Sequence, residues 1–373
     1  MAARREAFFR CADCGREQAM HEGAFECSCG GLLDIAGLDD RFDPREIDSK
    51  AHGIFRYRSL MPSAVDAFWR QASMGEGLTG LVEIDAGRRV SAKMDFAMPT
   101  LSFKDRGAAV LMAAVKGFGV REVIQDSSGN AGNSVAAYAA RLGIGCEIFV
   151  PESTSPNKVS QIRAYGAKVS LVPGTREDTA AEALSQARSG RYYASHVYNP
   201  LFYQGTKTYV YELWEQAGGK LPDVIALPVG NGTLLLGAYY GLLSLMDGGA
   251  IKEMPKVVAV QAERCAPVYE AYKGGMAVTS PVVNRGTAAE GIAIAAPKRG
   301  AGMLAAIRNL GGTVVTASED SIGVYARKLA AAGIFVEPTS AATLAGLMSW
   351  MDETGFEGTS VVPMCGAGLK SLH

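Results

Sequence analysis

The stretch VREVIQDSSGNAGNSVAAYAARL, residues 120–142, shows the unit from which the fold is built. Its first residues, Val120–Ile124, form a short apolar run that is typical of a buried strand. The polar, Gly-rich turn that follows leads into Asn133–Leu142, whose alanines and leucine favour a helix. A strand, a turn and a helix in this order predict one β-α unit of a parallel sheet.

The same alternation continues to the end of the chain. The other expected strands are Cys146–Val150, Lys168–Val172, Asp223–Pro228, Lys256–Gln261, Gly312–Thr316 and Ser360–Met364, and the other expected helices are Thr179–Ala187, Leu234–Leu245 and Ile322–Ala332. Near-continuous apolar strands with helices between them predict an α/β protein whose parallel sheets are covered on both faces. A chain of 373 residues is long enough for two or three domains.

Charge and composition exclude several classes of protein. Lys and Arg number 37 and Asp and Glu 38, so the net charge of −1 provides no basic field for nucleic acid or an anionic membrane. We find no uninterrupted apolar run of about 18 residues, which argues against a transmembrane helix. The start, MAARREAFFR, carries positive charge, but no apolar segment follows it as in a signal peptide. We therefore expect a cytoplasmic protein that acts on a small molecule.

Four of the seven cysteines lie close together, at Cys11, Cys14, Cys27 and Cys29. In a cytoplasmic chain such a cluster favours a metal site over disulfides. Both pairs are followed by glycines that let the backbone turn around a metal, so we expect a tetrahedral, structural Zn²⁺ site. Four protein ligands leave no open position, and we assign this site no catalytic role. The alternative is a Cys-rich arm that does not hold a metal.

Lys104 stands where a helix is expected to begin, in PTLSFKDRG followed by AAVLMAAVK. A solvated lysine beside Asp105 is the simpler interpretation. A helix N-terminus disfavours a cation, however, so this position suggests a function for the amine. One such function is a Schiff base with a carbonyl compound, which needs a lysine that is readily deprotonated.

Two Gly-rich turns between a strand and a helix provide sites for anions. The first offers the hydroxyls of Ser127 and Ser128, the amides of Asn130 and Asn133, and backbone N–H groups. The second, Gly230–Thr233, is a phosphate receptor by the same physics. An ordinary helix cap is the alternative interpretation of each turn.

The second turn lacks the spacing of a dinucleotide site. Its third glycine, Gly237, comes two residues later than in GxGxxG, and Glu263 lies 33 residues past Gly230 (263 − 230) rather than about 20. No GxxxxGK[ST] motif is present either. An imine-forming lysine, a carboxylate receptor and a phosphate receptor together suggest pyridoxal phosphate (PLP) and an amino-acid substrate.

These motifs, in this order along the chain, resemble those of a known family. PTLSFKDRG is similar to the lysine motif of threonine synthases, within the fold-type II (tryptophan synthase β-like) PLP enzymes. Other similar segments follow in order: GEGLTGLVEI, SSGNAGNSVAAYAA, NPLFYQGTKT, PVGNGT, AEGIAI, EPTSAA and CGAGLK. The resemblance implies two open parallel-sheet α/β domains with the cofactor between them, a small Cys-rich N-terminal arm, and a homodimer.

The resemblance also implies domain boundaries and residue roles. The arm would span 1–35, the large PLP-binding domain 36–115 and 211–373, and the smaller, mobile domain 116–210. Lys104 would form the Schiff base and Asn130 would bind the ring hydroxyl. The PLP phosphate would lie on Gly230, Asn231, Gly232 and Thr233, the substrate carboxylate on Ser127, Ser128 and Gly129, and the pyridine nitrogen against Cys365. A neutral partner such as Cys365 leaves that nitrogen unprotonated, which favours elimination and replacement over transamination.

Three departures from the family pattern bear on the reaction. The family usually has Thr-Pro-Leu where this chain has Thr79-Gly-Leu81, and Gly where Leu101 stands. Ala289-Glu-Gly-Ile292 looks more like the corresponding loop of threonine and serine dehydratases.

The leading hypothesis is a threonine synthase, which converts O-phospho-L-homoserine and water to L-threonine and phosphate. Its substrate phosphate needs a further cation, for which Lys158, Arg163 and Lys207 are candidates, although each is also consistent with a solvated surface. The alternatives are a threonine/serine dehydratase, a β-replacement enzyme such as a cysteate or cysteine synthase, and a non-catalytic amino-acid sensor.

Overall fold

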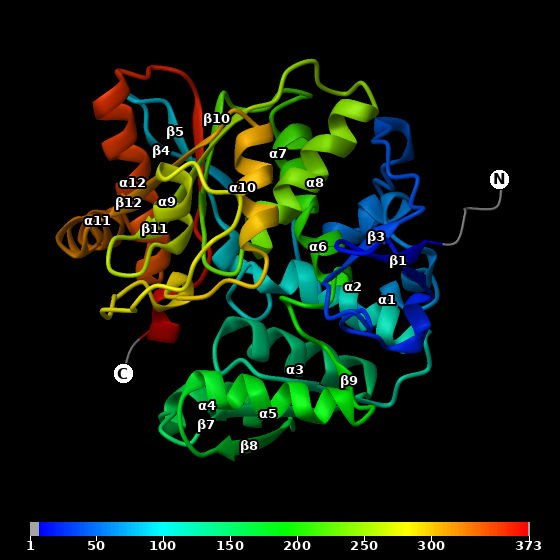
Figure 1. Ribbon diagram of the computed structural model, residues 1–373. Helices are drawn as coiled ribbons and strands as arrows, with labels where there is room; N and C mark the ends of the chain where they lie inside the picture. Colours follow the sequence, from blue (N-terminus) through cyan, green and yellow to red (C-terminus); the bar gives the residue numbers. More distant parts are fainter. Residues whose placement is uncertain (1–6, 372–373) are drawn as a thin grey trace. The chain divides into compact units, whose positions relative to one another are not determined.

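The computed structural model describes residues 7–371 (Figure 1). These residues form two compact units. Unit 1 contains residues 7–76 and 104–205, and unit 2 contains residues 77–103 and 206–371. The chain therefore passes from one unit to the other three times. Within the described residues, no helix is long and apolar enough to cross a membrane.

The α-helices of the described chain are divided between the two units. Those of unit 1 are α1 (Trp69–Ala72), α2 (Lys104–Gly117), α3 (Asn130–Leu142), α4 (Pro156–Ala164), α5 (Arg176–Arg188) and α6 (Leu201–Thr206). Those of unit 2 are α7 (Thr208–Gln216), α8 (Thr233–Asp247), α9 (Pro267–Lys273), α10 (Gly300–Asn309), α11 (Glu319–Ala331) and α12 (Pro338–Thr354).

Unit 1 contains a four-stranded parallel sheet with the strand order β8-β7-β6-β9. Its strands are β6 (Glu122–Gln125), β7 (Gly145–Pro151), β8 (Lys168–Val172) and β9 (Tyr192–Tyr193). Alternate residues of β7 face opposite sides: Ile148 packs with α3 and α4, and Phe149 packs with α5. A small antiparallel sheet also belongs to this unit and consists of β1 (Phe8–Cys11), β2 (Glu17–Gln18) and β3 (Leu33–Ala36).

Unit 2 contains a six-stranded sheet with the strand order β12-β11-β10-β13-β5-β4. Five strands are parallel, and the edge strand β4 (Leu81–Asp85) runs antiparallel to β5 (Val90–Lys93). The others are β10 (Val224–Pro228), β11 (Lys256–Ala262), β12 (Thr313–Ala317) and β13 (Ser360–Pro363). Helices α11 and α12 pack on the sheet through an apolar cluster that includes Val260, Leu329 and Leu347.

The expected parallel α/β architecture is confirmed, and every strand and helix expected from the sequence is present within a few residues of its expected bounds. The sequence analysis did not identify the parallel strands β5 and β9, the antiparallel edge strand β4 or the antiparallel sheet β2-β1-β3. The compact units also differ from the expected domains, because 36–76 and α2 group with 116–205. The shared core of α2, α3 and β6 accounts for this grouping.

Candidate active site

Lys104 is the first residue of α2, as the sequence predicted, and its side chain is half-buried. Its Nζ lies 6.0 Å from the ring centroid of Phe202. Glycines allow α2 and α6 to approach closely: a Cβ at Gly107 would lie 2.2 Å from the Phe202 ring, and one at Gly205 would lie 1.8 Å from the carbonyl oxygen of Arg106. The glycine in KDRG, Gly107, therefore allows the helix that begins at Lys104 to pack closely against α6.

Carboxyl groups are buried close to the start of α2. The fully buried Asp105 accepts a hydrogen bond from the Ser134 hydroxyl at 2.5 Å. Glu76, also fully buried, accepts hydrogen bonds from the Tyr138 hydroxyl at 2.9 Å and the Met74 N–H at 2.7 Å. Burial raises the pKa of Glu76 to about 7, although these hydrogen bonds act to lower it. The second carboxylate oxygen of Glu76 has no hydrogen-bond partner among the described residues. The sequence analysis missed Glu76, because nothing in the local pattern marks it as buried.

The turn between β6 and α3 has the geometry of an anion receptor. Gly129 precedes the helix, and no described side chain caps its N–H groups, which leaves them open to an anion. The Ser127 hydroxyl accepts a hydrogen bond from the Gly129 N–H at 3.3 Å. A Cβ at Gly132 would lie 1.8 Å from the carbonyl oxygen of Ser127, so only glycine fits there. Ser128 and Asn130 are half-buried at the same turn.

His196 is a candidate that the sequence analysis did not identify. The Asp126 N–H donates to Oε1 of Gln125, which turns the Gln125 amide nitrogen toward Nδ1 of His196 at 3.4 Å. Burial lowers the pKa of His196 well below its usual value, and the positive charges of Lys104 and Arg176 lower it further. This environment favours the neutral imidazole, which lies within electrostatic reach of Lys104. A single histidine after a short strand gives no signal in the sequence that could have revealed this.

In unit 2, three adjacent parallel strands bring candidate residues to one edge of the sheet. Strands β10, β13 and β5 are neighbours, and their carboxyl ends lie at the same edge. The first leads into Gly230–Thr233 and the second into Cys365. The third leads into residues 94–103, the segment that ends directly before Lys104.

The turn Gly230–Thr233 has the geometry of a second anion receptor. Gly232 has a left-handed φ of 79° and precedes α8, whose N-terminus no described side chain caps. A Cβ at Gly232 would lie 2.3 Å from Sδ of Met303, and one at Gly230 would lie 3.0 Å from Cα of Ile292. The left-handed φ of Gly232 favours glycine there, Gly230 has little room for a side chain, and the Glu290–Ile292 segment packs against the turn. Uncapped N–H groups in a glycine-rich turn fit a phosphate.

Cys365 follows β13 and is buried, with 2% of its surface exposed. Its N–H donates to the Ser340 hydroxyl at 2.8 Å, and its carbonyl oxygen accepts from the Phe103 N–H at 2.8 Å. Its thiol lies 3.8 Å from the carbonyl oxygen of Pro363. The backbone is thus fixed on both sides of this residue.

The three cations expected to bind a substrate phosphate belong to different units. Lys158 and Arg163 lie on α4 in unit 1, half-buried and exposed respectively. Lys207 belongs to unit 2, where it is fully buried before α7. The sequence analysis could not anticipate this burial from a single lysine.

A second buried lysine, Lys93, has a structural role. Its Nζ lies 2.8 Å from the carboxylate of Glu212, and both side chains are fully buried. It also donates to the carbonyl oxygen of Thr79 at 2.6 Å and to the side chain of Gln216 at 3.0 Å. Because these contacts occupy the amine, Lys93 can serve as a control for Lys104 when the lysine that binds the cofactor is identified by labelling.

The four cysteines of the N-terminal cluster converge. All four sulfur atoms lie within 4.8 Å of one another, and three of the distances are 3.5 to 3.7 Å. Gly15 and Gly30 adopt left-handed φ values of 71° and 86°, as expected for turns around a metal. A Cβ at Gly31 would lie 2.5 Å from Sγ of Cys11. A hydrogen bond from the Cys29 N–H is the main cause that lowers the pKa of Cys27 to about 6, which favours the thiolate.

A cavity of about 460 Å³ lies between β4, α11 and α12 in unit 2. Apolar side chains such as Met94, Leu344 and Met348 form part of its lining, together with Arg88 and Lys328. None of the residues predicted for the active site lines it.

A parallel α/β fold with a lysine at a helix start and two glycine-built anion receptors defines a class of PLP enzymes. Residues 72–366 match the family described as pyridoxal-phosphate dependent enzyme, and the chain belongs to this family. It is 33% identical over 357 residues to the threonine synthase of Methanocaldococcus jannaschii, which covers 92% of this chain and 87% of the relative.

Solved structures agree on the fold. The processed form of threonine deaminase isoform 2 from Solanum lycopersicum superposes with a TM-score of 0.67 at 24% identity, over 75% of each chain. The serine racemase of maize superposes with a TM-score of 0.69 at 20% identity, over 82% of this chain and 93% of that one. The protein is thus a PLP-dependent enzyme, and these neighbours leave its particular reaction open.

Proposed function

We propose that the protein is a threonine synthase, which converts O-phospho-L-homoserine and water to L-threonine and phosphate. The observation that carries the proposal is the similarity to threonine synthases along nearly the whole chain, including the motif around Lys104. The two glycine-built receptors support it, because the reaction needs one site for the substrate carboxylate and one for the cofactor phosphate.

Each candidate residue has a role in this reaction. PLP, when bound, supplies an electron sink for negative charge that develops next to the amino group of the substrate. Lys104 would bind the cofactor aldehyde and, once released, would move protons at Cα and Cβ of the substrate, so that phosphate leaves from Cγ and water adds at Cβ. The Ser127–Gly129 turn and Asn130 orient the substrate carboxylate and the cofactor ring. Gly230–Thr233 would bind the cofactor phosphate, and Cys365 would be the partner of the pyridine nitrogen.

A dehydratase is the second candidate. It is favoured by the segment Ala289–Ile292, which resembles dehydratases in sequence and packs against Gly230. A dehydratase would release a keto acid and ammonia from threonine or serine, without any phosphate.

Two assays on the PLP-loaded protein distinguish these reactions. A threonine synthase releases phosphate and threonine from O-phospho-L-homoserine, whereas a dehydratase forms keto acids from threonine and serine. Lys104→Ala should lower turnover by about 10³-fold, because proton transfer at both carbons depends on its amine. Borohydride reduction should attach the cofactor to the peptide that contains Lys104 and not to the one that contains Lys93. Keto acid without phosphate release would contradict the synthase.

We also propose that Cys11, Cys14, Cys27 and Cys29 bind one structural Zn²⁺. Sulfur atoms around a tetrahedral zinc, with Zn–S bonds of about 2.3 Å, lie roughly 3.8 Å apart. The distances of 3.5 to 3.7 Å approach this value and are far longer than the roughly 2.05 Å of a disulfide bond. Four thiolates complete the coordination and leave no position for a substrate.

A further inference from the structure

A buried polar contact joins the helices α2 and α3 close to the point where each begins. The Ser134 hydroxyl donates a hydrogen bond to Oδ1 of Asp105 at 2.5 Å, and both side chains are fully buried. Asp105 is the second residue of α2, and Ser134 is the fifth residue of α3. Both helices belong to unit 1.

The surroundings of this contact are apolar and consist largely of small side chains. Ala108 on α2 and Val135 and Ala139 on α3 are fully buried members of one apolar cluster. The attraction between such side chains is non-directional, so it holds two helices together without strictly fixing their register. A hydrogen bond has a preferred length and angle. The bond between Asp105 and Ser134 therefore fixes the register of α2 against α3.

Stability alone does not explain a carboxyl group at this place. Aspartate is almost never fully buried unless it is paired, and a well-packed apolar pair of similar volume is often just as stable. A second fully buried carboxyl adds to the cost, because burial and then the charge of Asp105 raise the pKa of Glu76. Buried polar groups that are retained at such a cost fix the register of helices in some proteins.

This register matters because each helix carries part of the proposed site beside the contact. Lys104 directly precedes Asp105 on α2. Asn130 precedes Ser134 by four residues, about one helical turn, so their side chains lie on the same face of α3. The receptor turn, whose N–H groups no described side chain caps, ends at Asn130. The hydrogen bond therefore fixes the lysine at the start of α2 relative to the receptor turn at the start of α3.

We propose that Asp105 and Ser134 are positioning residues, which hold the amine of Lys104 in register with the receptor turn at residues 127–130. The inference rests on the proposed function, in which Lys104 moves the Cα proton of an amino acid whose carboxylate binds this turn. The pair acts through the lysine and the turn. A misplacement of about 1 Å can slow a step that depends on position about 10²-fold, so a small shift of α2 against α3 lowers the rate strongly.

Exchange of the Cα proton of L-alanine for deuterium measures this positioning without any leaving group. NMR follows the exchange in D₂O with the PLP-loaded protein. Ser134→Ala and Asp105→Ala should each slow the exchange about tenfold or more. In the double variant the two losses should not add, because either substitution already breaks the bond. The double variant leaves neither partner of this bond buried alone, so it should fold even where a single variant does not.

Tyr138→Phe is the matched control. Tyr138 lies on the same face of α3, one turn beyond Ser134, and its hydroxyl donates to the buried Glu76 at 2.9 Å. Its replacement also removes a hydroxyl that is bonded to a buried carboxyl group, so it should lower the thermal midpoint as Ser134→Ala does. The rate of Cα exchange should stay nearly unchanged, since this bond lies farther from the receptor turn.

Amide exchange of the cofactor-free protein provides a readout that does not involve catalysis. Ser134→Ala should accelerate it in the first turns of both α2 and α3, whereas Tyr138→Phe should not. Equal losses of Cα exchange in these two variants, additive losses in the double variant, or a wild type that does not exchange L-alanine would overturn the proposal. Non-additive losses together with an absence of phosphate release from O-phospho-L-homoserine support the pair and refute only the synthase reaction.

Discussion

Cys365 shows how one side chain can be tested independently of its backbone. Hydrogen bonds with Ser340 and Phe103 fix its N–H and carbonyl groups, so substitutions act through the side chain alone. A neutral thiol donates only a weak hydrogen bond. The role proposed for Cys365 is therefore to leave the pyridine nitrogen unprotonated. The cofactor ring is then a weaker electron sink, which favours elimination and replacement over transamination.

Cys365→Ser should keep most of the activity, because a hydroxyl is a similar neutral partner. Cys365→Asp should protonate the ring nitrogen, shift the absorption spectrum and cut turnover by about tenfold or more. The spectrum and the product ratio of both variants provide the measurement. Cys265, a buried thiol after β11, is the control, and Cys265→Ser should leave both unchanged. An unaltered spectrum in Cys365→Asp would mean that residue 365 does not touch the ring.

Some residues of the candidate site could be predicted from the sequence, and others could not. Lys104 and the two Gly-rich turns lie in contiguous motifs, so their elements were predictable from local pattern. Glu76 and His196 were not, because their burial depends on segments far away in the sequence. The left-handed φ of Leu101 was hidden as well, since the residue type gives no sign of it.

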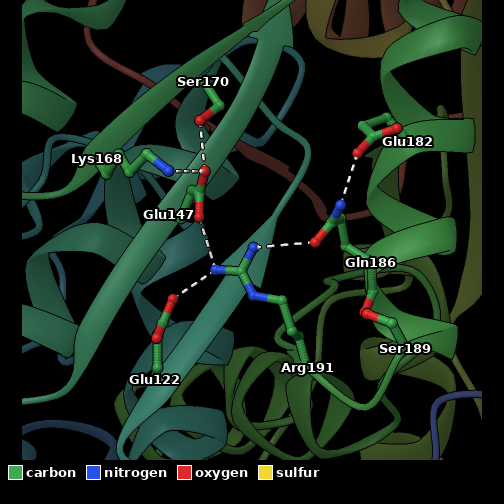
Figure 2. A network of polar contacts seen from close by, with 8 residues as sticks. All are labelled: Glu122, Glu147, Lys168, Ser170, Glu182, Gln186, Ser189 and Arg191. Carbon is green, nitrogen blue, oxygen red and sulfur yellow. Dashed lines mark hydrogen bonds and ion pairs between the residues drawn. The ribbon is translucent and has the colours of Figure 1, made fainter.

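Among the elements, the sheet of unit 1 carries a network of charges across three strands (Figure 2). Glu147 on β7 pairs with Lys168 on β8 at 2.8 Å and with Arg191, which precedes β9, at 2.6 Å. It also accepts a hydrogen bond from Ser170. Arg191 reaches Glu122 on β6 as well. Burial raises the pKa of Glu147, but the bonds from Lys168, Ser170 and Arg191 outweigh it and bring the pKa to about 2.

This network predicts a pH-dependent contribution to stability. A folded-state pKa of about 2, below the ordinary value of 4.5, means that Glu147 stabilises the fold above pH 4.5. The contribution is lost as the pH falls toward 2. Glu147→Gln should therefore lower the free energy of unfolding by about 1 kcal/mol at neutral pH, after screening by solvent.

Urea unfolding at several pH values measures this contribution. The difference between Glu147→Gln and the wild type should shrink steadily between about pH 4.5 and pH 3. Glu182→Gln is the control, because Glu182 accepts its hydrogen bond from the neutral side chain of Gln186. A difference that does not depend on pH would show that the ion pairs contribute nothing.

Element prediction found the strands of the β-α alternation after residue 120, including the edge strands β8 and β12, and missed β1 to β5 and the two-residue strand β9. Parallel strands such as β10 are continuous apolar runs, which the sequence reveals directly. Strand β4 reads LVEID and is partly exposed along its length, so its pattern resembles a loop. Its antiparallel pairing with β5 depends on the turn at residues 86–89, whose Arg89 at positive φ gives no turn signal.

At the scale of the whole molecule, the two units are built from interleaved segments of the chain. Local pattern does not say which unit a helix joins, because that choice depends on distant contacts such as the one between Gly107 and Phe202. The N-terminal cysteines illustrate this point. Cys11 and Cys27 are buried in the same apolar cluster as α2 and α3, so the proposed metal site lies against the core of unit 1.

If the cluster holds zinc as proposed, loss of the metal should weaken unit 1 and leave the proposed phosphate receptor of unit 2 intact. The purified protein should contain about one zinc per chain, and the variant Cys11→Ser, Cys27→Ser should contain none. Because both residues lie in the core of unit 1, we expect its thermal midpoint to fall and amide exchange in β1 and β3 to accelerate. Exchange at Gly230–Thr233 should stay unchanged. Cys146→Ser, which alters a half-buried thiol outside the cluster, should keep the zinc, and a zinc-free protein purified without chelator would refute the site.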